Sequence, residues 1–125
     1  MTNNIMNFLT LTAETIEETA LFTRISRTYA VGADREIRVV MRVAKNDRAN
    51  RVIGNRIVVS AAIRDPHEVV KYNGYSESIV TEEWRTKFIG EREVTYRSRG
   101  GHDFDKEMPH DLVAMAWGLL MHWQA

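Results

Sequence analysis

Arginine is concentrated in the middle of this 125-residue chain. Between Arg24 and Arg64 there are ten lysine or arginine residues against three acidic ones, and nine of the ten are arginine. The rest of the chain carries seven basic and fourteen acidic residues, so the net charge is zero. The guanidinium group presents a rigid fork of N–H donors that suits phosphate and carboxylate groups. The basic segment is therefore the first candidate for a binding site, and its ligand would be an anion.

Two predicted strands each carry two of these arginines on the face opposite their apolar positions. If the strands are neighbours, their four guanidinium groups lie on one sheet surface, and Arg24, Arg48 and Arg51 are candidates to lie nearby. The predicted anion-binding residues are Arg24, Arg38, Arg42, Arg56 and Arg64. Such a surface complements the phosphates of a nucleotide or of nucleic acid.

The same arginines have simpler explanations. They could pair with the acidic remainder of the chain in a solvated face or a subunit contact, and a codon bias toward arginine would give the same composition. Stacking of nucleic-acid bases also requires aromatic side chains beside the basic surface. Tyr29 is the one aromatic residue between positions 24 and 64. This favours a small anionic ligand or a partner protein over nucleic acid, which stays an alternative.

A second group of chemically capable side chains lies between residues 100 and 111. His102, Asp105 and His110 are of the types that bind a divalent metal or supply the acid and base of a small hydrolase. Their spacing matches no metal signature with a known mechanism, and a solvated acidic loop before the last helix explains them more simply. The chain has no cysteine and no glycine-rich phosphate loop. The sequence therefore favours a non-catalytic protein without a metal or cofactor.

The strands that position the arginines have a clear alternation of apolar residues. In the strands expected over residues 36–44 and 56–64, the inward positions are Ile37, Val39, Met41, Val43, Ile57, Val59, Ala61 and Ile63. We expect Asp65-Pro66 to end the second strand, because proline has no N–H to donate to a sheet.

Capping and turn signals divide the rest of the chain into short elements. Thr12 is a candidate N-cap, and Asn73-Gly74 is the favoured dipeptide of a type I′ hairpin turn. The elements expected from these signals are a helix over 13–18, a strand over 20–29, a polar loop over 46–50, hairpin strands over 69–72 and 75–80, a helical turn over 81–84, and strands over 87–89 and 92–98 separated at Gly90.

The last helix, expected over residues 110–123, is apolar on more than one face. Its main helical stripe consists of Leu112, Met115, Ala116, Leu119, Leu120 and Trp123. A second apolar set consists of Val113, Trp117 and Met121. One flat sheet cannot cover both sets, so either the sheet curls around the helix or another copy of the chain covers the second set. We predict a homo-oligomer with this second set in its interface.

These elements predict an α+β fold with a single domain over residues 1–125. Its mostly antiparallel sheet has five or six strands, with a short N-terminal helical segment and the apolar C-terminal helix packed on it. No apolar run approaches the roughly 20 residues that span a bilayer, and the lack of cysteine fits the cytoplasm. The predicted function is non-catalytic binding of a nucleotide-like anion or a partner protein, as in an accessory or inhibitory factor of a phage. Nucleic-acid binding and metal-assisted hydrolysis by the 102–111 cluster are the alternatives.

Overall fold

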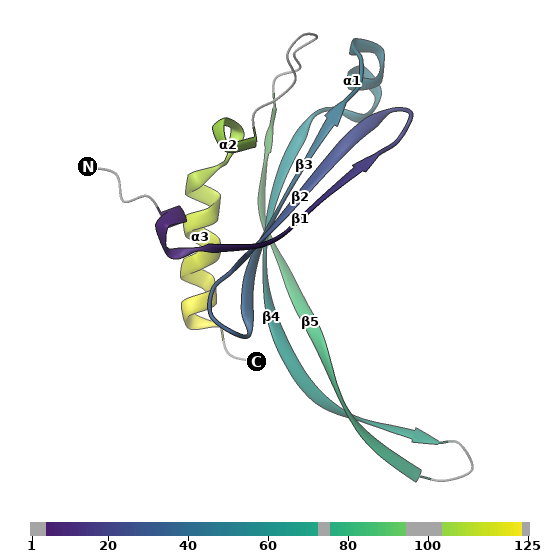
Figure 1. Ribbon diagram of the computed structural model, residues 1–125, viewed down its shortest axis with the longest axis vertical. Coiled ribbons are helices and arrows are strands. Elements are labelled where there is room, and N and C mark those ends of the chain that lie inside the picture. Colours follow the sequence, from purple (N-terminus) through teal and green to yellow (C-terminus); the bar gives the residue numbers. More distant parts are fainter. Residues whose placement is uncertain (1–4, 73–75, 95–103, 124–125) are drawn as a thin grey trace.

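The computed structural model describes residues 5–72, 76–94 and 104–123 (Figure 1). Its elements are the 3-10 helix η1 (Ile5–Phe8), the strands β1 (Thr10–Glu18), β2 (Phe22–Ala30), β3 (Arg35–Ala44), β4 (Arg56–Tyr72) and β5 (Ser76–Glu93), and the helices α1 (Asp47–Ile53), α2 (Phe104–Glu107) and α3 (His110–His122). Within these ranges, no helix has both the length and the apolar character needed to cross a membrane.

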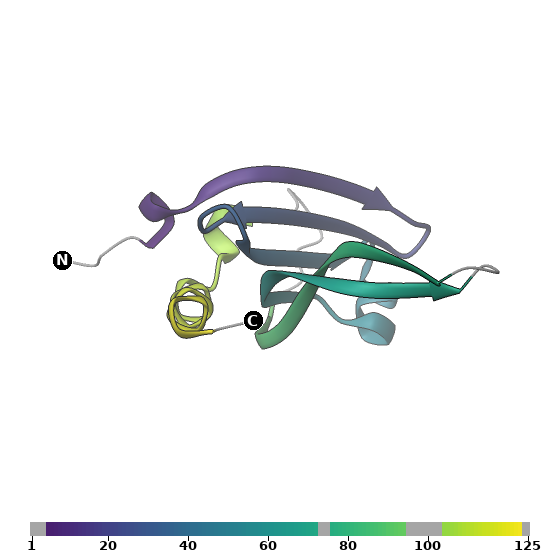
Figure 2. The ribbon, with the colours of Figure 1, turned by 90° about the horizontal axis from the view of Figure 1, so that it is seen from below.

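The five strands form one antiparallel sheet in the order β1-β2-β3-β4-β5, so each strand pairs with the next one along the chain. Helix α3 packs on one side of this sheet, against β3, β4 and β5 (Figures 1 and 2). Strands β4 and β5 are longer than the others and continue as a two-stranded ribbon that leaves the body of the molecule (Figure 1). The predicted α+β class, antiparallel sheet and packed C-terminal helix are confirmed.

The core lies between α3 and the two central strands, where the alternation predicted it. The inward positions of β3 and β4 with at most 1% of their surface exposed are Ile37, Val39, Met41, Ile57, Val59, Ala61 and Ile63. Val43, at the end of the series, is partly buried against the same cluster. Burying a side chain the size of valine or isoleucine contributes about 1.5–3 kcal/mol. This face therefore holds α3, and the arginines that alternate with these residues lie on the other face.

The segment before residue 19 is a strand, so the predicted helix over residues 13–18 is wrong. These residues belong to β1, which pairs antiparallel with β2. Four of the nine residues of β1 are threonine or isoleucine, whose branched side chains lose rotamer freedom in a helix and pack well on a sheet. Of the described residues before β2, only those of η1 are helical. The favourable N-cap residue Thr12 therefore contributes less here than the pairing of a whole strand.

Residues 46–50, expected to form a polar loop, contribute to the seven-residue helix α1. The side-chain Oδ1 of Asn46 accepts a hydrogen bond from the backbone N–H of Ala49 at 2.7 Å, which caps the first turn. The helix ends at Gly54, whose φ of +69° lies in the left-handed region that glycine adopts without strain. Asparagine is favoured both in turns and at N-caps, so the composition of residues 46–50 did not distinguish a loop from the start of a helix.

Strand β4 continues through Pro66, where the sequence predicts its end. Strand β3 pairs with β4 as far as Ile63, and the N–H of Arg64 still bonds the carbonyl of Asp34. Beyond Arg64, this edge of β4 has no partner among the described residues, and proline is tolerated on such an edge. Strand β5 likewise runs through the predicted helical turn at 81–84 and through Gly90, because β4 pairs with it along its whole length. The predicted turn residues 73–75 and the predicted strand residues 95–98 lie outside the described residues.

Candidate anion-binding face

Three arginines lie side by side across three neighbouring strands, on the sheet face turned away from α3. Arg24 on β2 pairs with Arg42 on β3, and Arg42 pairs with Arg56 on β4. Neighbouring strands are about 4.8 Å apart, so the three backbone positions are closely spaced. We call Arg24, Arg42 and Arg56 the arginine row.

The open face is hollowed beside the arginine row. A hollow of about 460 Å³ is lined by Arg24, Ser26, Val40, Arg42, Arg56, Val58 and Glu91. Pockets for small ligands have volumes of about 300–1,000 Å³, so this one is large enough for a small organic molecule. Val40 and Val58 are cross-strand partners two residues from the row, so the hollow is basic at one end and apolar on its floor.

The outer members of the arginine row have carboxylate partners, whereas the central member makes other contacts. Arg24 lies 3.6 Å from Glu17, and Arg56 lies 3.4 Å from Glu91. Both pairs are largely exposed, and such pairs contribute only about 0–1 kcal/mol. Within the part of the chain that the structure describes, Arg42 has no carboxylate partner; its Nη2 donates to the carbonyl of Ile53 at 2.8 Å. Its buried Nε has no acceptor among those residues.

A second buried donor without an acceptor among the described residues belongs to Asn55, which precedes Arg56 in the chain. Asn55 is 1% exposed, and its Oδ1 accepts the backbone N–H of Ala44 at 2.7 Å. Its Nδ2 has no hydrogen-bond partner among the described residues. Asn55 lines a hollow of about 290 Å³ that shares Arg56 and Glu91 with the larger one. A buried donor left unpaired costs about 1–3 kcal/mol, so the Nε of Arg42, a residue that lines the larger hollow, fits a ligand that brings an acceptor oxygen.

The other two predicted arginines lie further along the same face, around an aromatic ring. The guanidinium carbons of Arg38 and Arg64 lie 5.4 Å and 5.2 Å from the centre of the Trp84 ring. Arg38 also pairs with the carboxylate of Glu36 at 2.5 Å. Arg38 stands four residues from Arg42, about 13 Å along the strand. All five predicted arginines thus share a face, but only three of them line the hollow.

Sequence reasoning missed the aromatic residues of this face, because they lie outside the basic segment. Phe22 begins β2, and its ring centre lies 5.4 Å from the guanidinium carbon of Arg24. Trp84 and Phe88 come from β5, where they pair in register with Arg64 and Ser60 of β4. The alternation of Trp84, Thr86 and Phe88 would have revealed them had β5 been predicted as one continuous strand.

The predicted histidine and aspartate cluster does not assemble within the described residues. In those residues, no three His, Asp or Glu side chains meet in a way that could hold a metal. His102 lies outside them, His110 is exposed, and the Asp105 carboxylate pairs with Arg27 at 2.7 Å. Asp111 accepts a hydrogen bond from Arg92. Desolvation of the Asp111 carboxylate raises its pKa, but the hydrogen bond from Arg92 contributes to a net lowering of that pKa. The Asp111 carboxylate is therefore a poor proton donor.

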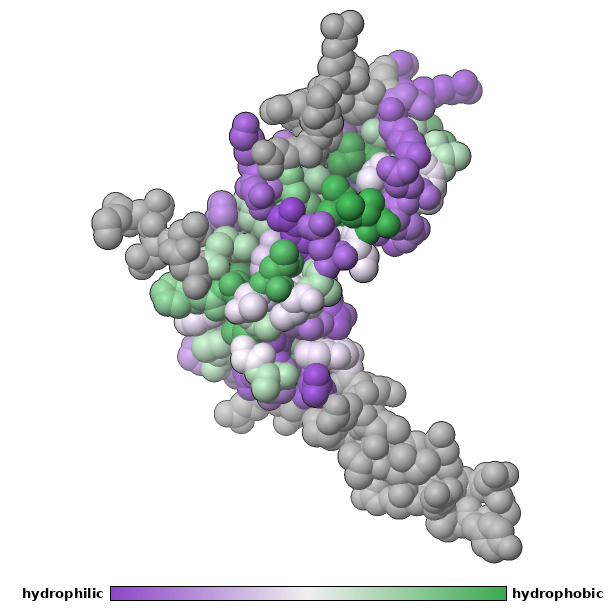
Figure 3. Space-filling view, viewed as in Figure 1, coloured by the Kyte–Doolittle hydropathy of each residue, from purple (hydrophilic) through white to green (hydrophobic). Residues whose placement is uncertain are grey.

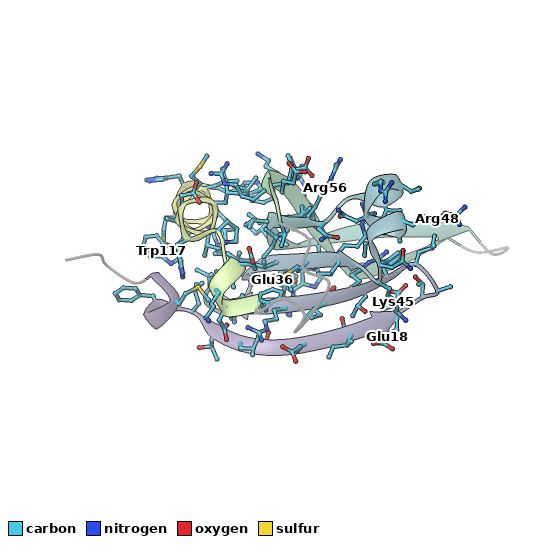
Figure 4. All side chains as sticks on the ribbon, turned by 90° about the horizontal axis from the view of Figure 1, so that it is seen from above. Glu18, Glu36, Lys45, Arg48, Arg56 and Trp117 are labelled. Atoms are coloured by element: carbon cyan, nitrogen blue, oxygen red, sulfur yellow. The ribbon has the colours of Figure 1, made fainter. Side chains whose placement is uncertain are left out.

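The structure places the three predicted interface residues at different depths. Val113 has no exposed surface and belongs to the core, Trp117 is half-buried against the core, and Met121 is 45% exposed. Figure 4 shows Trp117 on α3 at one end of the view and Arg48 on α1 at the other. The residues of α3 that are buried are Leu112, Val113, Ala116 and Leu120. Val113 therefore fixes the helix to its own sheet and is not accessible to a partner.

The outer face of α3 carries exposed methionines. Met115 is 59% exposed, although the sequence assigns it to the inward stripe. Met121 is 45% exposed. Green and white residues, the apolar and weakly polar ones, prevail on the surface over α3 in Figure 3. When several stripes of a helix are apolar, its amphipathic pattern does not say which one faces the sheet. Self-association through this helix stays a prediction.

The self-association prediction is tested at Met121, because changing it leaves the core intact. If the outer face of α3 is a subunit contact, Met121→Lys is expected to shift a dimeric or larger wild type to monomer. Its Tm should change little, since surface substitutions usually stay within about 0.5 kcal/mol. Light scattering gives the mass, and Leu21→Lys, at an apolar residue 51% exposed in another part of the chain, is the matched control. A monomeric wild type would contradict the prediction.

Comparison with known proteins adds no assignment to this geometry. No protein-family model, curated protein or solved structure matches the chain. A fold by itself does not define a function, because functions reside in sites. The functional argument therefore rests on the arginine row, the hollow beside it and the Nε of Arg42 without an acceptor among the described residues.

Proposed function

We propose that this protein is a non-catalytic binding protein that captures a phosphate-bearing anion in the hollow beside the arginine row. The observation that carries the proposal is the direct cross-strand register of Arg24, Arg42 and Arg56. Like charges directly opposite one another destabilise a sheet, and a bound oxyanion relieves that repulsion. Its oxygens also supply an acceptor for the Nε of Arg42, which has none among the described residues.

The surroundings of the arginine row favour a small ligand over a long polyanion. Glu17 pairs in register with Arg24 at one end of the row, and Glu93 pairs with Arg56 at the other. The positive stretch is therefore three strands wide, about 10 Å between its outer backbone positions. A chain with one phosphate per nucleotide would meet a carboxylate on either side. An acidic segment of a partner protein would satisfy the same donors and would compete with a phosphate probe.

The proposal is tested with inorganic pyrophosphate and tripolyphosphate on the wild-type protein. A ligand that binds only the folded state raises Tm in proportion to the logarithm of its concentration, by about 2.7 kcal/mol of stability at 100 times Kd. We expect such a rise in differential scanning fluorimetry and a matching Kd in calorimetry. Sodium chloride at equal ionic strength is the control. A Tm that follows ionic strength alone would overturn the proposal.

Single-stranded nucleic acid is the second candidate, favoured by the aromatic residues further along the face. Trp84 lies between Arg38 and Arg64, and Phe88 is 65% exposed on the same side. Base stacking on such rings contributes about 1–3 kcal/mol per base. An oligonucleotide titration at two salt concentrations tests it, because each neutralised phosphate makes the affinity fall as salt rises. Absence of binding at low salt would remove this candidate.

A further inference from the structure

The chemistry of the open face changes in regular steps along β3 and β4. Two residues from the arginine row, Val40 pairs with Val58. Two residues further, Ser60 pairs with Phe88 on β5. Each step of two residues spans about 6.6 Å, so the β4–β5 side of the face passes from basic to apolar to aromatic within about 13 Å. On the β3 side, Arg38 stands opposite Ser60 and is paired with Glu36. A ligand that fits this order has a charged end and a flat, apolar end.

A carboxylate stands between the basic and aromatic ends. Glu91 lines the hollow and pairs in register with Val58, so it lies on β5 between the level of Arg56 and that of Phe88. Glu91 forms the exposed pair with Arg56 at 3.4 Å, and as a carboxylate it repels a simple inorganic anion in the hollow. Sugar hydroxyls are donors that a carboxylate accepts, as it does with the ribose of dinucleotides in other proteins.

We infer that the ligand is a nucleotide, with its phosphates at the arginine row, its ribose hydroxyls at Glu91 and its base over the valine floor against Phe88. The inference rests on the proposed function and names the class of its ligand. Phe88 suits the base because its ring is 65% exposed and no described cation lies over it, whereas two guanidinium groups lie over each of the rings of Phe22 and Trp84.

The test compares ligands that share three phosphates and differ in the rest of the molecule. ATP, UTP and inorganic tripolyphosphate are titrated by calorimetry into the wild type, Phe88→Ala and Phe88→Leu. We expect the wild type to bind at least one nucleotide about tenfold more tightly than tripolyphosphate, the size of effect that one aromatic stack produces. Both Phe88 variants should lose this preference and keep the wild-type affinity for tripolyphosphate. Met115→Ala, at an exposed apolar residue of α3, should change neither.

Substitution of the carboxylate gives an independent readout. Glu91→Gln should strengthen tripolyphosphate binding, because a repelling charge is removed, and should reduce the preference for the nucleotide. Equal affinities of the wild type for nucleotides and tripolyphosphate would overturn the inference and leave the proposed function standing. A nucleotide preference that survives in both Phe88 variants would also overturn it. Failure of all three ligands to bind would overturn the proposed function as well.

Discussion

Substitution of Gly90 by alanine is expected to destabilise the protein by about 1–3 kcal/mol, the usual cost of overpacking a core. A Cβ atom at this position would lie 2.8 Å from Cδ2 and 3.2 Å from Cδ1 of Leu112. Leu112 is only 6% exposed and packs in the core, so its side chain has little space to move away. Gly90 on β5 therefore sets how closely α3 approaches the sheet.

A double-mutant cycle isolates this contact. Leu112→Ala alone should cost about 2–5 kcal/mol, as large-to-small changes in a core do. In the double variant with Gly90→Ala, the added methyl group meets no leucine branch, so the combined loss should be smaller than the sum of the single losses. Urea unfolding at 25 °C measures all four proteins. Additive losses would contradict the assigned contact.

Gly118 provides the matched control for the cycle. It lies on α3, and a Cβ added there meets no atom within 4 Å. Alanine is preferred over glycine in a helix by about 1 kcal/mol, so Gly118→Ala should stabilise the protein slightly. A loss of stability on substitution of Gly90 and a gain on substitution of Gly118 would separate the packing effect from a general effect of replacing glycine.

The central strands could be predicted because one face of each is buried. A period of two assigns every residue of such a strand to a face, and the inward residues of β3, from Ile37 to Met41, indeed have no exposed surface. The same period placed the arginines on the other face. Strand β1 has no buried residue to set such a pattern, and its identity comes from its pairing with β2. That pairing joins neighbouring segments of the chain, from Glu18 with Thr23 to Thr10 with Ala30, but the exposed side chains of β1 show no alternation that would reveal it.

The candidate site could be predicted in composition but not in arrangement. Alternation brings Arg42 and Arg56 to one face, but only strand order and register place them opposite each other. Register depends on the whole sheet, so the sequence did not separate the row from Arg38 and Arg64. Nor did it predict the burial of Asn55, a polar residue that follows α1 and accepts the backbone N–H of Ala44.

The arginine row gives a second prediction, in which binding and stability respond differently. Arg42→Gln is expected to weaken tripolyphosphate binding by about tenfold to a hundredfold, because hydrogen bonds to charged groups contribute about 1.5–3 kcal/mol each and 1.4 kcal/mol is a factor of ten. Arg48→Gln makes the same change of charge on α1 at an exposed residue outside the row, and its affinity should stay near that of the wild type.

The stability of Arg42→Gln should not fall, although its tripolyphosphate binding is weaker. Arg42→Gln removes a positive charge that stands directly opposite Arg24 on one side and Arg56 on the other, and such like-charged pairs oppose folding. The bond from Arg42 Nη2 to the carbonyl of Ile53 at 2.8 Å is lost, because the amide nitrogen of glutamine ends two bonds short of Nη2. Such a bond contributes about 0.5–1.5 kcal/mol, which the relief of the two like-charged contacts offsets. We therefore expect an unchanged or higher midpoint in urea without ligand. A large loss of stability in Arg42→Gln would show that Arg42 mainly stabilises the sheet. Weaker tripolyphosphate binding by a variant of unchanged stability would show that the charge of Arg42 serves anion binding.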